Sequence, residues 1–299
     1  MAAARWIAEI KDKVAGAIIA ALKAGNLPPW RKPWYDGGLI PRNGMTKRPY
    51  AGINVLYLQA VSFLEKYKSN DWFTWKTMKK LGGSMKEGEG SRSWIVIYYN
   101  WILKSDAIND EDRFPMMKYF RVYNREQLDD LPAPEAMPVL SEQERIASVD
   151  NFVTNIEINA EIKMNTGGRA CYYPLTDKIE MPPYKDFKSA ELFYATLYHE
   201  LVHWTGSKER LNRDMNAFKT DRDTYAYEEL VAEIGSAMLC NITKITGDTQ
   251  PAEYIKSWIK LLENDTKAIF TSAGLAQKAV DYLIGKSGIT FWEPDEEAA

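Results

Sequence analysis

The chain has 299 residues, two cysteines and a formal net charge of −3, and its length suits two domains of ordinary size. The cysteines, Cys171 and Cys240, are far apart in the sequence, which excludes a disulfide framework and a paired-cysteine metal site. No apolar run is long enough to span a bilayer, and charges from Glu9 onward interrupt the N-terminal segment before a secretory signal could form, so we expect a cytoplasmic protein with no membrane partner.

The charge is distributed unevenly along the chain. Residues 1–130 contain 21 lysines and arginines and 14 acidic residues, a net charge of +7. Subtraction from the totals of 38 and 41 leaves 17 basic and 27 acidic residues for 131–299, a net charge of −10. A basic half joined to an acidic half indicates nucleic-acid contact by the first.

We expect residues 1–125 to form a mixed α+β domain. Apolar residues at helical spacing predict a helix from Ile7 to Leu22 and a second helix from about Asn54 to Lys66. The segment Trp94–Tyr99 has the composition of a strand, and Tyr119–Tyr123 is the strand expected to pair with it.

Seven of the ten tryptophans lie in this basic half, mostly near lysines and arginines. Proteins that bind single strands without sequence preference combine a cationic groove with aromatic faces on which bases stack. The alternative for most of the tryptophans is a place in the core of the domain. No helix-turn-helix or zinc-finger spacing is visible, which argues against base-specific readout of a duplex. The candidate DNA-binding residues are Trp30, Arg31, Lys32, Trp34, Arg42, Lys47, Arg48, Trp75, Lys76, Lys79, Lys80 and Arg92.

Residues 126–140 are predicted to be an exposed linker, because prolines and acidic residues occur there without a sustained helical or strand period. The second domain, residues 141–299, begins with a helix from Ser141 to Ile156 that opens on a capping box. Three short segments follow that predict a small antiparallel sheet, and several helices complete the domain. The expected strands are Ala160–Met164, Arg169–Pro174 and Asp177–Pro182, and the expected late helices are Ala252–Leu262 and Lys267–Ile284.

The only two histidines of the chain, His199 and His203, stand four residues apart in the run His199-Glu200-Leu201-Val202-His203. A lone histidine in a helix is more often a packed core residue than a ligand, so the context decides between the two readings. The preceding residues have a helical pattern and Gly206 supplies a stop, and residues four apart on a helix lie on the same face. Both imidazoles can therefore bind one metal ion, and Glu200 is placed to hold a water beside it as the catalytic base.

A catalytic zinc site usually has three protein ligands, so a third must come from elsewhere. A second helical pattern runs from Tyr225 to Leu239, with Glu229 and Glu233 four residues apart on one face. We assign Glu229 as the third ligand and Glu233 as the outer acceptor for a histidine N–H. Glu228 is the rival; its alternative reading is a solvated acid near a helix N-terminus.

The segments His199–Gly206, Arg210–Arg213 and Tyr227–Glu233 resemble the ArdC family of plasmid antirestriction proteins, and the resemblance extends over the whole chain. It implies an α+β protein of two domains, an N-terminal single-stranded-DNA-binding domain and a C-terminal zincin-like domain of the thermolysin type. It also implies bacterial cytoplasmic proteins that protect incoming plasmid DNA from host restriction during conjugation. In zincins of this arrangement the strand before the metal helix commonly borders the cleft, so Lys178–Met181 is either that edge or an ordinary meander strand.

The expected mechanism is zinc-dependent peptide hydrolysis, with His199, His203 and Glu229 as ligands and Glu200 as the base. Tyr225, Tyr227, Arg210 and Arg222 are candidates for stabilising the oxyanion, and the sequence does not select one. The partners expected are single-stranded DNA and an unidentified protein substrate, for which a component of the restriction system is one candidate.

Three alternatives stay open at this point. Mn²⁺ or another divalent transition metal could replace Zn²⁺. The protein could instead be a non-catalytic DNA-shielding protein whose metal site is structural or idle. A nuclease or primase is a third class, but such enzymes favour clusters of Asp and Glu for Mg²⁺.

Overall fold

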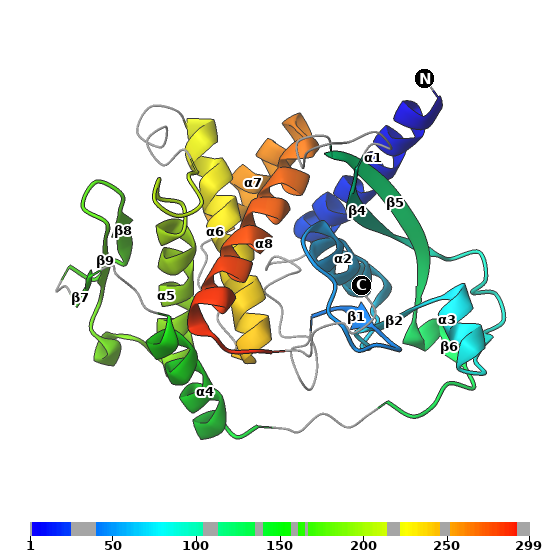
Figure 1. Cartoon of the computed structure of the whole chain (residues 1–299), viewed down its shortest axis with the longest axis horizontal. Coiled ribbons are helices and arrows are strands. Elements are labelled where there is room, and N and C mark those ends of the chain that lie inside the picture. The colour runs from blue at the N-terminus through cyan, green and yellow to red at the C-terminus, as the bar shows by residue number, and fades with distance from the viewer. Residues whose placement is uncertain are drawn as a thin grey trace.

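The computed structural model describes residues 2–24, 40–103, 113–134, 140–156, 161–164, 167–213, 222–245 and 252–291 (Figure 1). The described part of the N-terminal half is a mixture of helices and strands, as expected. Its helices are α1 (Ala2–Ala24), α2 (Ile53–Glu65) and α3 (Trp75–Lys80), and its strands are β1 (Arg42–Asn43), β2 (Asp71–Thr74), β3 (Ser84–Met85), β4 (Trp94–Leu103), β5 (Arg113–Asn124) and β6 (Leu128–Asp129).

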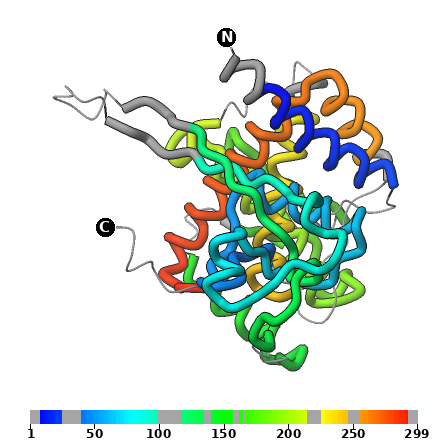
Figure 2. Tube along the Cα trace, turned by 90° about the vertical axis from the view of Figure 1, so that its right-hand side faces the viewer, coloured from blue at the N-terminus to red at the C-terminus, as the bar shows by residue number. Residues whose placement is uncertain are grey.

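The main sheet of this half has the strand order β1-β2-β5-β4. Strands β4 and β5 pair antiparallel over their whole described length, from Trp94 opposite Val122 to Leu103 opposite Arg113, which confirms the predicted pair. Figure 2 shows the two strands side by side as a twisted ribbon. The predicted helices are also confirmed as α1 and α2, within a few residues at each end.

The first residues of the predicted linker have regular secondary structure. Residues Arg125–Gln127 form a 3-10 turn, η3, which Asn124 caps by accepting a hydrogen bond from the backbone of Glu126 at 3.0 Å. Strand β6 then pairs with β3, and Leu128 is buried. A cap and a strand pairing therefore hold residues 126–129 beside the elements of the N-terminal half. Residues 132–134 are exposed, and 135–139 lie outside the described residues.

The described C-terminal half is built mainly of helices around a small sheet. It contains α4 (Glu142–Asn155), β7 (Glu161–Met164), β8 (Cys171–Tyr173), β9 (Lys178–Met181), the 3-10 turn η4 (Tyr184–Asp186), α5 (Ala190–Trp204), α6 (Arg222–Thr243), α7 (Ala252–Asn264) and α8 (Lys267–Ser287). The capping box predicted for α4 is present: Ser141 Oγ accepts from Glu144 N, and the Glu144 side chain accepts from Ser141 N. The predicted late helices are confirmed as α7 and α8.

The small sheet differs from the prediction in its pairing. Its strand order is β7-β9-β8, with β7 and β9 parallel and β8 and β9 antiparallel, so the sheet is mixed rather than antiparallel. Ile179 and Met181 of β9 are fully buried, which suits a central strand covered by both neighbours. Lys178–Met181 is therefore not the edge beside the metal helix, and β8 is an edge strand that contacts α5.

The two halves share one hydrophobic core. Helix α1 packs against α2 and α7, and α2 packs against α8, as the neighbouring blue and orange helices of Figure 1 show. The Gly52 backbone N–H also donates to the Gln277 side chain of α8 at 2.9 Å. Burial of apolar surface thus joins the halves as well as stabilising each one. In the part of the chain that the structure describes, no helix is both long and apolar enough to cross a membrane.

Candidate metal centre

Helix α5 is the element that presents the two histidines. It begins at a cap, where Ser189 Oγ accepts a hydrogen bond from Leu192 N at 3.2 Å. Its apolar residues are buried on several faces, so the helix lies inside the domain and holds His199 and His203 in a protected position. Gly235 of α6 allows the two helices to approach closely at Val202, next to His203.

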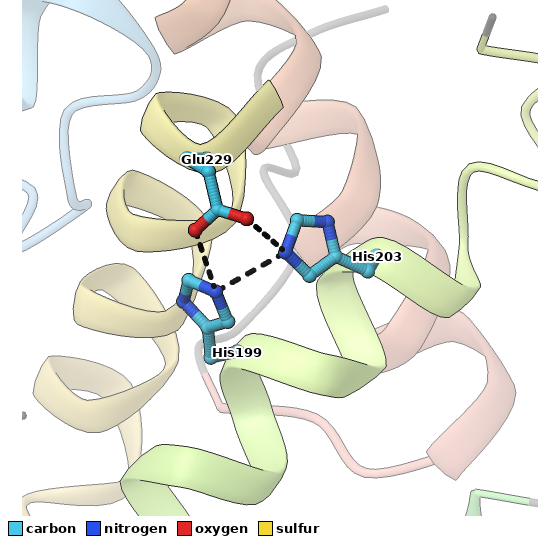
Figure 3. A group of neighbouring side chains, drawn as sticks. All are labelled: His199, His203 and Glu229. Atoms are coloured by element: carbon cyan, nitrogen blue, oxygen red, sulfur yellow. Dashed lines mark hydrogen bonds and ion pairs between the residues drawn. The ribbon is translucent and has the colours of Figure 1, made fainter. Parts of the chain in front are cut away.

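His199, His203 and Glu229 converge between α5 and α6 (Figure 3). The His199 Nε2 and His203 Nε2 atoms are 3.1 Å apart, and they lie 3.5 and 3.6 Å from the two oxygens of Glu229. Two imidazole nitrogens and a carboxylate are the donor set of a catalytic zinc site with a fourth position for water. The residues present therefore fit a divalent transition metal, and the three ligands assigned from the sequence lie together.

The electrostatics of the group favour a cation. Burial alone would lower the pKa of His203, but Glu228, Glu229 and Glu200 outweigh it and raise that pKa to about 9. Burial alone would raise the pKa of Glu229, but a hydrogen bond from His199, the charges of both histidines and a hydrogen bond from Tyr225 lower it to about 2. The carboxylate is therefore ionised, and positive charge is favoured between it and the rings.

Glu200 lies at the same end of α5 and is buried. Its Oε2 accepts a hydrogen bond from the backbone N–H of Tyr172 at 2.7 Å. Because Tyr172 is in the edge strand β8, this contact ties the expected catalytic base to the sheet beside the metal ligands. The geometry agrees with a role for Glu200 outside the ligand set, since it is not one of the three converging residues.

Glu228 provides an outer contact of one histidine. His203 Nδ1 lies 3.3 Å from Glu228 Oε1, whereas His199 Nδ1 is buried without a hydrogen-bond partner. Glu233 is fully buried on the same helix, and its assignment as an acceptor for a histidine N–H stays a prediction. Glu228 is buried rather than solvated, because Arg213 forms an ion pair with it at 2.7 Å.

Arg213 is the main functional candidate that the sequence reasoning missed. The residue was visible only as part of the motif Arg210–Arg213, and a charged residue after a helix usually indicates a solvated loop. Its burial depends on how residues 205–213 fold back onto α5, which a local pattern does not reveal.

The structure distinguishes the candidates for oxyanion stabilisation. Arg210 pairs with Asp177 and lies over the Trp204 ring at 4.0 Å, so its charge is used in packing. Tyr227 lies beside Thr271 and Ser272 of α8, away from the ligands. Tyr225 is placed best, because its side chain hydrogen-bonds Glu229. The side chain of Arg222 lies outside the described part of the structure.

Three of the candidate DNA-binding cations are paired with acids. Asp71 accepts from Arg42 at 2.6 Å and from Lys47 at 2.9 Å. Arg92 forms ion pairs with Glu65 and Glu89. The neighbouring acids partly neutralise the positive charge of these three side chains. They are therefore weaker candidates for binding phosphates than the sequence alone indicates.

The cations of α3 are arranged differently. Lys76, Lys79 and Lys80 are exposed, and so is Trp75, whose side chain is 51% accessible. Lys79 Nζ lies 5.2 Å from the Trp75 ring centroid. In contrast, Trp72 is fully buried in the core. Arg48 is exposed, while Trp30, Arg31, Lys32 and Trp34 lie outside the described residues.

The β4–β5 ribbon adds exposed aromatic residues that the sequence reasoning did not select. Tyr98, Tyr119 and Phe120 are exposed, and Lys118 lies opposite Tyr98. The signal was available, because neighbouring residues of a strand face opposite sides and Tyr119 and Phe120 cannot both face one core.

Comparison with known proteins identifies two regions. The N-terminal domain of the anti-restriction factor ArdC matches residues 8–123, and the zincin-like metallopeptidase family matches residues 147–275. Both agree with the α+β architecture of an N-terminal domain followed by a zincin-like domain. The boundaries of the domains at 125 and 141 stay predictions.

Relatives of known structure and sequence are similar over most of the chain. The antirestriction protein ArdC of plasmid R388 is 37% identical, and the match covers 93% of this chain and 97% of that one. TM-scores are 0.74 with its metal-free and 0.75 with its Mn(II)-bound crystal structure. The uncharacterized protein y4eC of Sinorhizobium fredii (strain NBRC 101917 / NGR234) is 35% identical over 92% of this chain and 91% of its own length. These matches confirm the resemblance inferred from the motifs.

A longer protein also contains a similar region. The DNA primase TraC of Escherichia coli is 33% identical over 91% of this chain, but the match covers 20% of the primase. The chain therefore corresponds to a fifth of that protein.

Proposed function

We propose, given that this chain belongs to the ArdC family of antirestriction proteins, that it is a metal-dependent peptidase that binds single-stranded DNA and protects incoming plasmid DNA from host restriction during conjugation. The observation that carries the peptidase proposal is the convergence of His199, His203 and Glu229 beside the buried Glu200. The protein substrate is unidentified, and a component of the restriction system is the first candidate.

His199, His203 and Glu229 would hold the ion, which is Zn²⁺ by its donor set; Mn²⁺ is the alternative, since a relative's structure contains Mn(II). When bound, such an ion supplies Lewis acidity to a peptide carbonyl and lowers the pKa of water. Glu200 takes a proton from the attacking water and later delivers it to the leaving amine. The Tyr172 N–H orients one oxygen of Glu200 for this task. Tyr225, held beside Glu229, is the candidate donor to the oxyanion.

The DNA-binding part of the proposal is supported by exposed side chains of the N-terminal half. Trp75 and the lysines of α3 provide a stacking surface beside positive charge. Tyr98 and Phe120 lie on the same face of the β4–β5 ribbon, because Val96 pairs with Phe120 and lies two residues before Tyr98. Because these aromatic side chains lie outside the hydrophobic core, their ring faces are accessible for stacking on unpaired bases.

The second candidate function is DNA shielding without proteolysis. It is favoured by the exposed aromatic and basic residues of the N-terminal half, which would act without the metal site. The two candidates differ in whether Glu200 is needed for protection.

The test is protection of transferred DNA in a recipient that expresses the parent or Glu200→Ala protein at equal levels and confirmed metal content. Loss of protection in Glu200→Ala supports proteolysis, whereas full protection supports shielding. Glu209→Ala is the matched control, because Glu209 is exposed beyond the end of α5. Titration with poly-dT across a salt series tests the DNA claim, and absence of binding at low salt would refute it.

A further inference from the structure

The loop after the metal helix returns Arg213 to the last turn of α5. Residues 205–213 are held by backbone hydrogen bonds from Leu211 N to Thr205 O at 3.0 Å, from Asn212 N to Ser207 O at 2.8 Å and from Arg213 N to Gly206 O at 2.9 Å. These backbone bonds close the loop and bring residue 213 next to the last turn of α5. The position of the Arg213 side chain is therefore set by the fold of the loop.

Arg213 is buried, and its guanidinium has several acceptors. Its Nε and Nη2 donate to the two oxygens of Glu228 at 2.9 and 2.7 Å. Its Nη1 donates to Thr205 Oγ1 at 2.9 Å, and Nη2 also donates to the Val202 carbonyl at 2.6 Å. The two parallel bonds to Glu228 are the fork geometry that gives arginine–carboxylate pairs their orientation.

The same carboxylate contacts a metal ligand. Glu228 Oε1 lies 3.3 Å from His203 Nδ1, while Nε2 of that ring faces Glu229 and His199. A proton on Nδ1 that is donated to Glu228 leaves the lone pair of Nε2 free for a metal. Arg213, Glu228 and His203 thus form a continuous buried chain from the loop to the ligand group.

We propose that Arg213 and Glu228 are positioning residues for the metal site, which hold the His203 ring in the tautomer and orientation that bind the ion. The inference rests on the proposed metal site and deepens it. A purely structural ion pair is the competing explanation, because breaking a buried pair destabilises a protein wherever it lies.

The variants separate these explanations. Arg213→Met and Glu228→Gln each break the fork, and the double variant removes both charges so that no unpaired charge is left buried. Arg210→Met is the matched control: Arg210 lies in the same loop, pairs with Asp177 and stacks on Trp204, but does not contact His203. The metal-free full chain is titrated with Zn²⁺ against a chromophoric chelator, and the unfolding of the same samples is measured with urea.

We expect the dissociation constant for Zn²⁺ to rise roughly 10–100-fold in Arg213→Met and in Glu228→Gln, the range found for residues that support metal ligands. The double variant should bind Zn²⁺ about as weakly as each single variant, because all three variants lose the same contact, the paired hydrogen bonds between Arg213 and Glu228. Arg210→Met should lower stability but change the dissociation constant less than about twofold.

Parental Zn²⁺ affinity in Glu228→Gln and in the double variant would overturn the proposal. An equal loss of affinity in Arg210→Met at the same folded fraction would also overturn it. If Arg213→Met does not fold, Glu228→Gln and the double variant decide the question. If the parent itself binds neither Zn²⁺ nor Mn²⁺, the proposed metal site fails together with the inference, and this result is distinct because it requires no variant.

Discussion

Substitution of Gly235 by alanine tests whether the close contact of α5 and α6 sets the metal site. A Cβ at residue 235 would lie 2.8 Å from Cγ2 and 3.1 Å from Cγ1 of Val202, and ordinary contacts begin at 3.4 Å. Valine in a helix has essentially one χ1 rotamer, so its methyl groups cannot turn away. The helices must then separate locally by the difference, 3.4 − 2.8 = 0.6 Å.

The expected energies follow from two opposing effects. Alanine is better than glycine in a helix interior by about 1 kcal/mol, and overpacking a core costs about 1–3 kcal/mol. Gly235→Ala should therefore be less stable than the parent by about 0–2 kcal/mol. Gly274→Ala in α8 is the control, because a Cβ there has nothing within 4 Å and should stabilise by about 1 kcal/mol.

The same displacement should weaken metal binding. His203 is on α5 and Glu229 is on α6, and metal–ligand distances tolerate only about 0.2 Å. We expect urea unfolding and chelator competition to show lower stability and weaker Zn²⁺ binding for Gly235→Ala than for Gly274→Ala. Val202→Ala in the Gly235→Ala background should restore part of the stability and part of the Zn²⁺ affinity, because it removes the methyl groups that the new Cβ meets. Equal stability and equal Zn²⁺ affinity of the two glycine variants would refute the argument from close packing.

Three further predictions concern the ligands and the DNA surface. Glu229→Ala should weaken Zn²⁺ binding by more than the roughly 10–100-fold expected for a supporting residue, as measured by chelator competition, and an unchanged affinity would exclude it as a ligand. Because the pKa of His203 is raised to about 9, both ring nitrogens are protonated at pH 7 in the metal-free protein, and the ring is a cation. Zn²⁺ binding should therefore release protons, and the affinity for Zn²⁺ should increase as pH rises toward 9. Calorimetry in two buffers of different ionisation enthalpy tests this, because equal observed binding enthalpies in the two buffers would mean that no proton is released. Trp75→Ala should cost about 1–3 kcal/mol of poly-dT binding, as measured by titration, whereas Tyr184→Ala, at an equally exposed aromatic of the C-terminal half, should leave poly-dT binding unchanged.

Much of the local structure was predictable because its causes are local. The helical spacing of His199 and His203 places both rings on one face whatever surrounds the helix, so their convergence was predictable from the sequence. The cap at Ser141 depends on residues three apart, and the structure has it. The pairing of β4 with β5 was found because both segments have clear strand composition.

Other features depend on contacts between distant residues. The order β7-β9-β8, with β7 and β9 parallel, differs from the predicted antiparallel sheet, because strand pairing depends on contacts between segments that are separated in the sequence. The pairing of Asp71 with Arg42 and Lys47 is invisible in a charge count.

The sequence by itself determined that His199 and His203 share one face of a helix, that a second helix offers Glu229 and that the chain divides into a basic and an acidic half, because these follow from helical periodicity and composition. Only the tertiary structure showed that Glu228 lies against His203, with its Oε1 3.3 Å from Nδ1 of the ring. Glu228 and Glu233 both lie on α6, and either could reach a histidine by spacing alone. Arg213 accounts for the burial of Glu228, because a buried carboxylate costs less free energy where the fold brings a cation to it.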